Sequence, residues 1–318
     1  MSLAHSLVFY FCKKGKRRYE PGKVPDYEAS RRSELRQNRF AQAPRSVKIE
    51  ERRLGGVPVE LLSRPGNPAD RIVLYLHGGG FVVGSVKTRR AFTGYLVVKL
   101  GFNVAAVEYR LAPEHPFPFA PEDCFAAYRE LLREYRPGKI VLLGESAGGN
   151  LVLSVLLQIK AAGLPMPAAA LCFSPCVQFD RVLKSYVENA KTEAMVSDLS
   201  EEVLDTYLRS HDAEKAREPI FAPYYGDFSG CPPVYLWASE SEVLRDDSVI
   251  LYEKLRAAGQ GCNLYLRKNM LHTWLVIPYI PEARADLKLV KKCIENAFDG
   301  VFRAEPDAVH LENCHGQH

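Results

Sequence analysis

The sequence lacks the features that mark several large protein classes. Its eight cysteines include no C-x-x-C pair, and their scattered positions suggest neither a zinc site nor a disulfide scaffold. A net charge of +4 over 318 residues is too small to indicate nucleic-acid binding. No stretch is long and apolar enough to span a bilayer, and there is no internal repeat or low-complexity region. These absences leave an ordinary globular protein with reduced core cysteines, which imply the cytoplasm.

The first residues combine a short apolar run with a basic cluster. Residues 2–12 are mostly apolar, and they are followed by Lys13, Lys14, Lys16, Arg17 and Arg18. A signal peptide has its positive charges before the apolar run, so this order argues against one. We expect a helix that packs on the domain, with the basic cluster as a solvated face. Binding of a membrane surface or an anionic partner is the alternative.

The middle of the chain alternates short apolar runs with helical patterns. Strands are expected at residues 71–76, 103–109, 139–143, 168–173, 233–238 and 263–266. Helices are expected at residues 89–100, 121–135 and 147–160. Strands that are apolar throughout and separated by helices predict an α/β fold, with a mostly parallel central sheet covered on both faces. In such a sheet, functional residues follow the carboxyl ends of the strands.

Two segments interrupt this alternation, and we expect them to form a helical cap. Residues 1–45 are charged and helix-prone, and an insertion at about residues 178–218 contains an amphipathic helical pattern. The catalytic domain is expected to cover residues 46–302. A polar tail at residues 303–318 is expected to lack regular structure.

The strongest local signal is the sequence Gly144-Glu145-Ser146-Ala147-Gly148. It lies between a predicted strand and a predicted helix, which is the context of a G-x-S-x-G nucleophile elbow. Small flanking residues are needed there because a Cβ would collide with neighbouring backbone in the tight turn. A chance match in a glycine-rich loop is the alternative, and the surrounding elements argue against it. We predict that Ser146 is a nucleophile raised above the sheet.

A glycine-rich loop, His77-Gly78-Gly79-Gly80-Phe81, follows the predicted strand at residues 71–76. Three consecutive glycines leave backbone N–H groups accessible to a ligand. A phosphate-binding loop is the alternative, but G-x-x-x-x-G-K-[ST] and G-x-G-x-x-G are both absent. We predict that Gly78, Gly79 and Ala147 donate the N–H groups of an oxyanion hole. We expect His77 to hold the shape of the loop rather than to titrate.

An acid and then a histidine follow the serine in hydrolases with this elbow. The segment after the strand at residues 233–238 offers four carboxylates, which are Glu240, Glu242, Asp246 and Asp247. Glu242 fits best, because Glu240 is nearer the strand end and the aspartates suit the first turn of a helix. His272 follows the last predicted strand, whereas other histidines are terminal, in the cap or in a proline-rich loop. We predict Glu242 as the acid that orients the general base His272.

Together, these motifs resemble those of the hormone-sensitive-lipase-like branch of the α/β-hydrolase family. The resemblance extends over about residues 72–274, through the segments at residues 75–81, 109–118, 144–150 and 242–247 and through His272. It implies an α/β-hydrolase fold with a cap built from the N-terminus and an insertion. The chain has Glu242 where many relatives have Asp, and Ala238 where relatives often have Gly. Asp123 matches a family position that we interpret as structural.

The resemblance implies a carboxylesterase that cleaves small-molecule esters of short to medium acyl chains, without a cofactor or metal. The triad would be Ser146, His272 and Glu242, acting through an acyl-enzyme. An acyltransferase or amidase with the same triad stays open, because the pocket decides which nucleophile or leaving group fits. A non-catalytic binding protein is a further alternative, but the related plant gibberellin receptors lack the histidine that is present here. We expect no nucleic-acid partner and no stable membrane insertion, with a homodimer left open.

Overall fold

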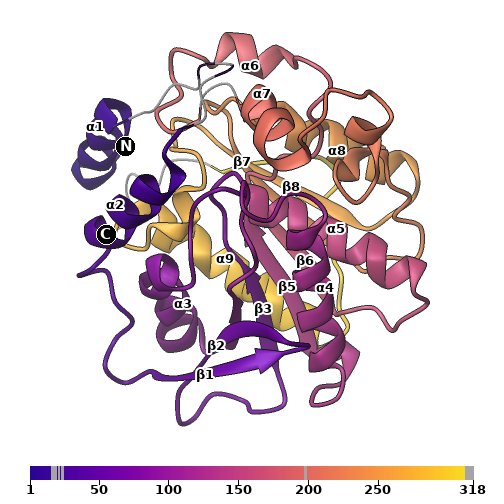
Figure 1. Cartoon of the computed structure of the whole chain (residues 1–318). Helices are drawn as coiled ribbons and strands as arrows, with labels where there is room; N and C mark the ends of the chain where they lie inside the picture. Colours follow the sequence, from indigo (N-terminus) through magenta and orange to yellow (C-terminus); the bar gives the residue numbers. More distant parts are fainter. Residues whose placement is uncertain (16–19, 21, 23–24, 197–198, 312–318) are drawn as a thin grey trace.

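The computed structural model describes residues 1–15, 20, 22, 25–196 and 199–311. Within these residues, nine strands form one sheet in the order β1-β2-β4-β3-β5-β6-β7-β8-β9 (Figure 1). The strands are β1 Lys48–Leu54, β2 Val57–Ser63, β3 Ile72–Leu76, β4 Asn103–Val107, β5 Ile140–Glu145, β6 Ala169–Phe173, β7 Val234–Ser239, β8 Cys262–Arg267 and β9 Val309–Leu311. β2 pairs antiparallel with β1 and with β4, and all other pairs are parallel.

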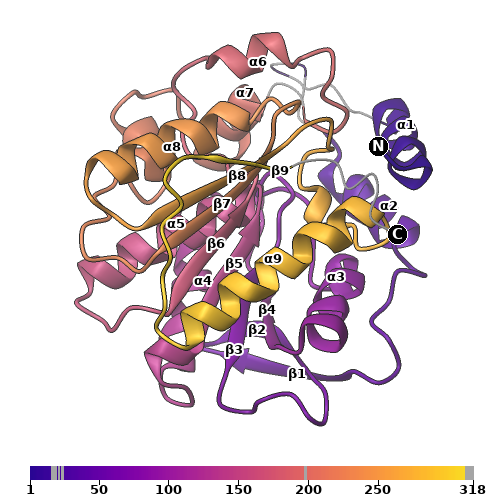
Figure 2. The ribbon, with the colours of Figure 1, turned by 180° about the vertical axis from the view of Figure 1, so that it is seen from behind.

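Helices connect the strands and cover the sheet on both faces. They are α1 Leu3–Gly15, α2 Tyr27–Gln37, α3 Arg90–Tyr95, α4 Phe119–Leu131, α5 Ala147–Ala161, α6 Lys184–Glu188, α7 Leu199–Val203, α8 Arg245–Ala257 and α9 Pro281–Phe298. Short turns of 3-10 helix are η1 Lys87–Arg89, η3 Pro137–Lys139, η5 Lys215–Arg217, η6 Pro223–Tyr225 and η7 Trp274–Val276, and turns of π-helix are η2 Leu96–Leu100 and η4 Leu204–Leu208. Figures 1 and 2 show α4, α5 and α8 over one face and α3 and α9 over the other. The predicted α/β architecture is confirmed.

The central strands are buried because helices cover both of their faces. Every residue of β3, β5 and β6 is buried, as their continuous apolar runs predict. One core layer lies between the sheet and α4, α5 and α8, and the other lies on the side of α3 and α9. Full burial of a leucine or phenylalanine side chain contributes about 1.5–3 kcal/mol. These two layers hold the strand ends that carry the site.

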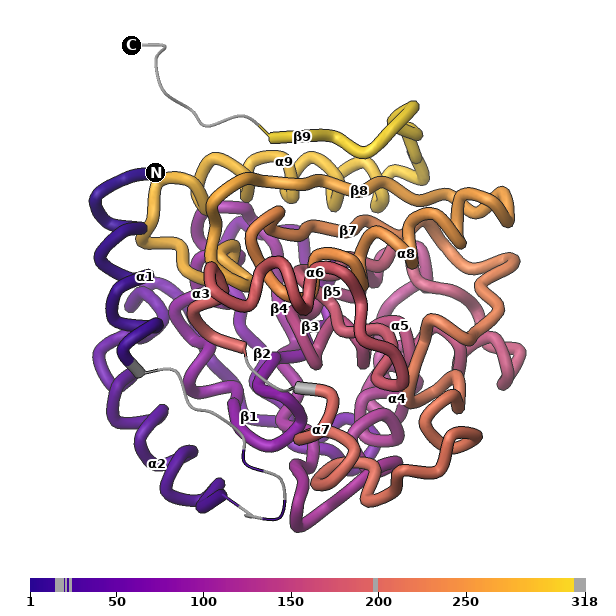
Figure 3. The backbone as a smooth tube through the Cα atoms, turned by 90° about the horizontal axis from the view of Figure 1, so that it is seen from above, coloured from indigo at the N-terminus to yellow at the C-terminus, as the bar shows by residue number. Residues whose placement is uncertain are grey.

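The two cap segments contact each other and the loop after β3. The hydroxyl of Tyr27 on α2 donates to Oε1 of Glu202 on α7 at 2.9 Å. Oε2 of Glu34, also on α2, accepts a hydrogen bond from the N–H of Gly84 at 2.9 Å. Figure 3 shows α6 and α7 in front of the strands, with α1 and α2 beside them. Both segments that interrupted the α/β alternation therefore lie near the glycine-rich loop.

Several elements of the described chain have no counterpart among the predicted ones, and four of them bear on the sheet. β1 and β2 form an antiparallel hairpin, and β1 exposes many of its side chains, so it has no continuous apolar run. α9 covers the sheet after the last predicted strand. β9 pairs with β8 inside the tail that was expected to lack regular structure, so that expectation is wrong for residues 309–311.

Some expectations concern residues that the structure does not describe. Lys16, Arg17 and Arg18 of the basic cluster and residues 312–318 of the tail lie outside the described residues. Among the helices of the described chain, none has the length and apolarity that a bilayer span requires.

Candidate active site

Ser146 lies at the sharp turn between β5 and α5. Its φ of 54° puts a residue with a side chain in the left-handed region. The flanking glycines make this turn possible, because a Cβ on Gly144 would lie 2.3 Å from the Gly148 carbonyl oxygen. A Cβ on Gly148 would lie 2.0 Å from the carbonyl oxygen of Leu76. The N–H of Ser146 donates to the carbonyl oxygen of Phe173 at 2.8 Å, which ties the turn to β6.

His272 and Glu242 form a buried pair at the ends of β8 and β7. The imidazole Nδ1 lies 2.5 Å from Oε2 of Glu242, and the two residues are 4% and 1% exposed. Of the four carboxylates after β7, Glu242 is the one that contacts this ring. Glu240 contacts a histidine of the C-terminal segment, and Asp246 and Asp247 accept hydrogen bonds from backbone N–H groups after β6.

Two opposing effects act on the pKa of His272. Burial disfavours the imidazolium and lowers the pKa, but the hydrogen bond and the charge of Glu242 outweigh burial and raise it above the ordinary value. Because Nδ1 donates to Glu242, the basic nitrogen is Nε2, which is buried and has no hydrogen-bond partner among the described residues. No hydrogen bond joins Ser146 and His272 within the described chain. Such catalytic hydrogen bonds often form fully only when substrate binds.

Ser174, directly after β6, links the elbow to the acid and the base. The carbonyl group of Phe173, one residue earlier, accepts the N–H of Ser146. The Ser174 hydroxyl donates to Oε1 of Glu242 at 2.8 Å and accepts from the N–H of Thr273 at 3.2 Å. Since Thr273 follows the base, one side chain holds the acid and the histidine loop against the strand that supports the elbow. Sequence reasoning missed Ser174, and its place after a buried strand was the available signal.

The first glycine of the loop after β3 does not fit its predicted role. The N–H of Gly78 donates to Oε1 of Glu145 at 2.7 Å. The same carboxylate accepts the hydroxyl of Tyr75 at 2.7 Å and Nε of Arg89 at 2.9 Å. A single N–H directed at a buried carboxylate is not available to an oxyanion. The prediction of Gly78 as an oxyanion donor is therefore wrong for this structure.

Three other N–H groups near the elbow stay unused. Those of Gly79, Gly80 and Ala147 have no hydrogen-bond partner among the described residues. Ala147 begins α5, where N–H groups have no acceptor inside the helix. At Gly79, φ is 127° and a Cβ would lie 2.2 Å from the Val83 carbonyl oxygen, so this backbone requires glycine. The sequence did not indicate Gly80, because only a contact reveals which of three adjacent glycines is already bonded.

His77 and Asp123 have the supporting roles that the sequence indicated. Nδ1 of His77 donates to the carbonyl oxygen of Gly78 at 2.9 Å, and the ring stacks on Tyr109 with centroids 4.2 Å apart. Burial lowers the pKa of His77 to about 4, so the ring is neutral at pH 7. Asp123 accepts hydrogen bonds from the backbone N–H and the guanidinium of Arg110. Both side chains fix loops rather than take part in proton transfer.

The cysteines of the described chain are unpaired, and all but Cys12 are buried. Burial raises the pKa of Cys124, Cys172 and Cys176 well above the ordinary range, so these thiols stay protonated at neutral pH. Such thiols are packing residues of the core rather than nucleophiles.

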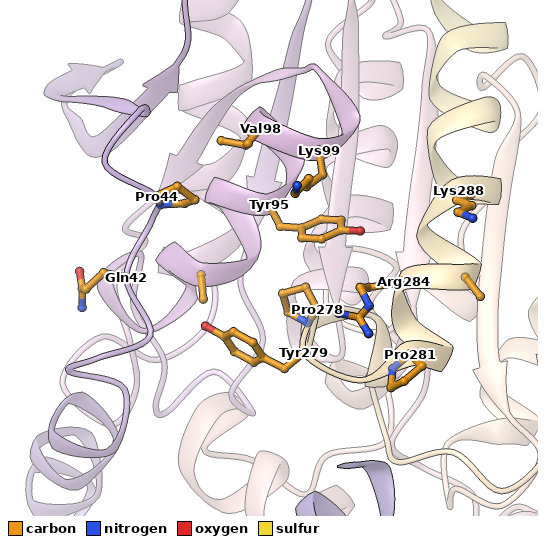
Figure 4. Close-up of a pocket in the computed structure, with 12 residues that line it drawn as sticks. Gln42, Pro44, Tyr95, Val98, Lys99, Pro278, Tyr279, Pro281, Arg284 and Lys288 are labelled. Atoms are coloured by element: carbon orange, nitrogen blue, oxygen red, sulfur yellow. The ribbon is translucent and has the colours of Figure 1, made fainter. Parts of the chain in front are cut away.

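A separate hollow of about 700 Å³ lies between α3 and α9 (Figure 4). Its lining includes Pro44, Tyr95, Lys99, Tyr279, Arg284 and Lys288. None of the predicted site residues lines it. The hollow is therefore distinct from the candidate active site.

The fold and the site define a hydrolase class, and comparisons with known proteins place the chain within it. A family model described as "alpha/beta hydrolase fold" matches residues 73–276, and the chain belongs to this family. An acetyl-hydrolase of Streptomyces hygroscopicus is 34% identical over 238 residues, which cover 74% of this chain and 78% of the relative.

Solved structures add the branch of the family. An esterase of the bacterial hormone-sensitive lipase family aligns with a TM-score of 0.86 and 30% identity, covering 94% of this chain and 99% of the other. The structure of EstE5 soaked with p-nitrophenyl butyrate has the same TM-score and identity, and the alignment covers 94% of this chain and 100% of EstE5. The predicted fold, the family resemblance and the carboxylesterase class are thereby confirmed. The triad residues and the acyl range stay predictions.

Proposed function

We propose that the protein is a serine esterase with Ser146 as nucleophile, His272 as general base and Glu242 as the acid that orients the base. This proposal rests on the buried Glu242–His272 pair, in which Nε2 has no hydrogen-bond partner among the residues that the structure describes. The hydrogen bonds of Ser174 support it, because they bring the loop of this pair to the strand end that accepts the Ser146 N–H.

The first half of the reaction transfers the acyl group to the enzyme. Oγ of Ser146 attacks the ester carbonyl carbon while its proton passes to Nε2 of His272. Glu242 accepts the hydrogen bond of Nδ1 and stabilises the imidazolium without taking the proton itself. The tetrahedral intermediate then collapses, the bond to the alcohol oxygen breaks, and His272 gives its proton to the departing alcohol. Water repeats these steps on the acyl-enzyme and releases the carboxylic acid.

The oxyanion of the intermediate is stabilised by the N–H groups of Gly79, Gly80 and Ala147. They are already fixed by the glycine loop and by the start of α5, so little reorganisation is needed. Each such donor contributes on the order of 10²–10³ in rate. Gly78 contributes indirectly, because its hydrogen bond to Glu145 holds the loop against the elbow.

We expect acyl chains of short to medium length. The names of the related acetyl-hydrolase and of the butyrate-soaked EstE5 support this range. Phe81 directly follows the oxyanion glycines, and its ring stacks on Tyr207 of η4 with centroids 4.0 Å apart. Both rings are buried, at 0% and 1% exposure, so they close the space beside the loop.

The test is a series of p-nitrophenyl esters from acetate to laurate, assayed with the wild type and Ser146→Ala. We expect kcat/KM to be highest for a short or medium chain and to fall toward laurate, while Ser146→Ala loses hydrolysis and unfolds at the wild-type temperature. Full activity of Ser146→Ala would refute the nucleophile, and highest activity on laurate would refute the acyl range. An added alcohol or amine that becomes the main acyl acceptor would favour a transferase.

A further inference from the structure

Helix α1 has two apolar faces, and within the described part of the chain only one of them packs on the protein. The packed face consists of His5, Val8, Phe9 and Cys12. The other face, here called the α1 stripe, consists of Leu3, Leu7, Tyr10 and Phe11, with exposed fractions of 88%, 57%, 60% and 62%. These positions have the spacing of one helix face. Four large apolar side chains gathered on one exposed face mark a binding surface more often than scattered single ones do.

The α1 stripe belongs to a helix that is firmly attached to the domain. The hydroxyl of Ser2 donates to Glu282 at the start of α9, at 2.8 Å. The N–H of Leu271 donates to Nε2 of the buried His5 at 3.3 Å. Because Leu271 directly precedes His272, α1 contacts the loop that carries the proposed base. Whatever binds the α1 stripe is therefore held beside the candidate active site.

The segment that contains and follows the α1 stripe is positively charged in sequence. The first 19 residues contain no Asp or Glu, while five cations occupy positions 13–18. Lys13 and Lys14 lie in the last turn of α1. An apolar face next to basic residues suits an anionic lipid surface. It does not suit the same helix of a second copy, because two basic segments would then repel each other.

Further cations lie near the start of α9, to which α1 is attached. The hollow of Figure 4 is lined by Lys99, Arg284 and Lys288, and none of these pairs with an acid among the described residues. Arg284 is two positions from Glu282, the residue that holds Ser2. These unpaired cations add to the positive potential on this part of the molecule.

We propose that α1 is a reversible anchor for an anionic phospholipid surface. The α1 stripe enters the boundary between headgroups and acyl chains, and Lys13 and Lys14 bind phosphate groups. Because α1 contacts the loop of His272, a bound enzyme has its candidate active site next to the lipid. Amphiphilic esters dissolved in the lipid then reach the site without crossing water.

The test is co-sedimentation of the full chain with vesicles of equal parts phosphatidylcholine and phosphatidylglycerol, and with phosphatidylcholine alone. We expect the wild type to bind the anionic vesicles and to be released by salt. Leu7→Ser/Phe11→Ser should lower the partition coefficient about tenfold or more, because two side chains no longer enter the lipid. Lys13→Gln/Lys14→Gln should lower it about fivefold for each lysine.

Matched controls separate this surface from general stickiness. Arg133→Gln/Arg136→Gln removes two cations from the segment between α4 and η3. Val182→Ser/Val187→Ser removes two apolar side chains that are 77% and 70% exposed. Both should bind as the wild type does. All these variants should hydrolyse soluble p-nitrophenyl acetate normally, and the single variant Leu3→Ser replaces Leu7→Ser/Phe11→Ser if that variant does not. Ser146→Ala should bind fully, so binding and catalysis can fail independently.

Three results would overturn the proposal. One is equal binding to both kinds of vesicle at every salt concentration. Another is an equal loss of binding in the α1 variants and their controls. The third is that the wild type binds no vesicles and has a larger molar mass in solution than Leu7→Ser/Phe11→Ser. That result would show that the α1 stripe joins two copies of the protein.

Discussion

Two buried glutamates, Glu145 within the elbow and Glu242 after β7, have similar sets of hydrogen-bond donors and differ in one partner. Glu145 accepts the hydroxyl of Tyr75, the N–H of Gly78 and Nε of Arg89, at 2.7, 2.7 and 2.9 Å. Glu242 accepts the hydroxyl of Ser174, the N–H of Ser239 and Nδ1 of His272, at 2.8, 2.7 and 2.5 Å. Each is 1% exposed. Each therefore has one hydroxyl, one backbone and one nitrogen-base donor, and only the base differs.

The difference in the base separates a structural role from a catalytic one. Burial alone would lower the pKa of Arg89, but the charges around it, Glu145 foremost, raise it, so the guanidinium stays charged at every ordinary pH. Glu145 is thus compensated permanently. His272 can be neutral or charged, so Glu242 receives a full opposite charge only when the imidazole takes a proton. A carboxylate beside a titratable partner can stabilise charge that develops during a reaction.

The largest expected effect comes from removing the carboxylate beside the histidine. Glu242→Ala should lower kcat for p-nitrophenyl acetate by about 10³–10⁴-fold, because the imidazole loses its tautomer and the imidazolium its counter-charge. Glu240→Ala, two positions away, should leave kcat within about twofold. Its ion pair with His310 lies at the surface, and surface ion pairs contribute little. A greater loss in Glu240→Ala than in Glu242→Ala would transfer the acid role.

Removing the other carboxylate should act mainly on stability. Glu145→Gln leaves Arg89 with Glu34 as its remaining acidic partner, at 2.8 Å. We expect the free energy of unfolding to fall by about 2–3 kcal/mol, because a buried cation loses a partner. Urea unfolding measures it. kcat should fall about tenfold, since Gly78 is then held less firmly and the oxyanion donors beside it shift.

Glu60 provides the control for this prediction. It is 3% exposed and pairs with Arg90 at 2.5 Å, away from the glycine loop. Glu60→Gln should destabilise by a similar amount and leave kcat unchanged. A loss of kcat as large as that of Glu145→Gln would mean that loosening the fold, rather than the loop, lowers the activity.

The pH dependence should also differ between the two glutamates. Since Glu242 raises the pKa of His272 above its ordinary value, kcat/KM should fall as pH falls through that raised pKa and the base becomes protonated. In Glu242→Gln this acid limb of the residual activity should move to lower pH, whereas Glu145→Gln should leave it in place. If the acid limb of kcat/KM stays at the wild-type pH in both variants, His272 is excluded as the titrating base.

The raised pKa of His272 also affects the stability of the fold. A histidine whose pKa is higher in the folded than in the unfolded chain stabilises the fold fully below its unfolded pKa, about 6.5. This stabilisation is lost as pH rises through the raised folded pKa. The Glu145–Arg89 pair adds no such change over that range, because Arg89 keeps its charge.

The sequence predicted those parts of the molecule that follow from local pattern. β3, β5 and β6 were found within a few residues, because buried parallel strands are continuous apolar runs. β1 was not, since an edge strand with exposed side chains has no such run. The sequence of α9 has a helical pattern and begins with Pro281, a residue favoured at the first position of a helix. It was not predicted, because no predicted strand followed it to complete an alternating helix–strand unit.

The site divides in the same way. Short motifs and chain order indicated Ser146, Glu242 and His272. Two other features depend on contacts between distant parts of the sequence. The Gly78 N–H bonds Glu145, which is 67 positions away, and the Ser174 hydroxyl bonds Glu242, which is 68 positions away. A motif shows which donors exist, but only the folded chain shows which of them are already occupied.

The smallest expected effects come from deleting one hydroxyl at each glutamate. Ser174→Ala removes a donor from Glu242 and an acceptor from Thr273, so kcat/KM should fall about three- to tenfold through misplacement of the base. Tyr75→Phe removes one donor from Glu145, which should cost about 1–2 kcal/mol of unfolding free energy and change kcat/KM less than about threefold. Parallel urea titrations and kcat/KM measurements compare them. If the two variants exchanged these effects, Glu145 rather than Glu242 would be the carboxylate coupled to the reaction, because a hydroxyl affects the rate only through the carboxylate that it holds.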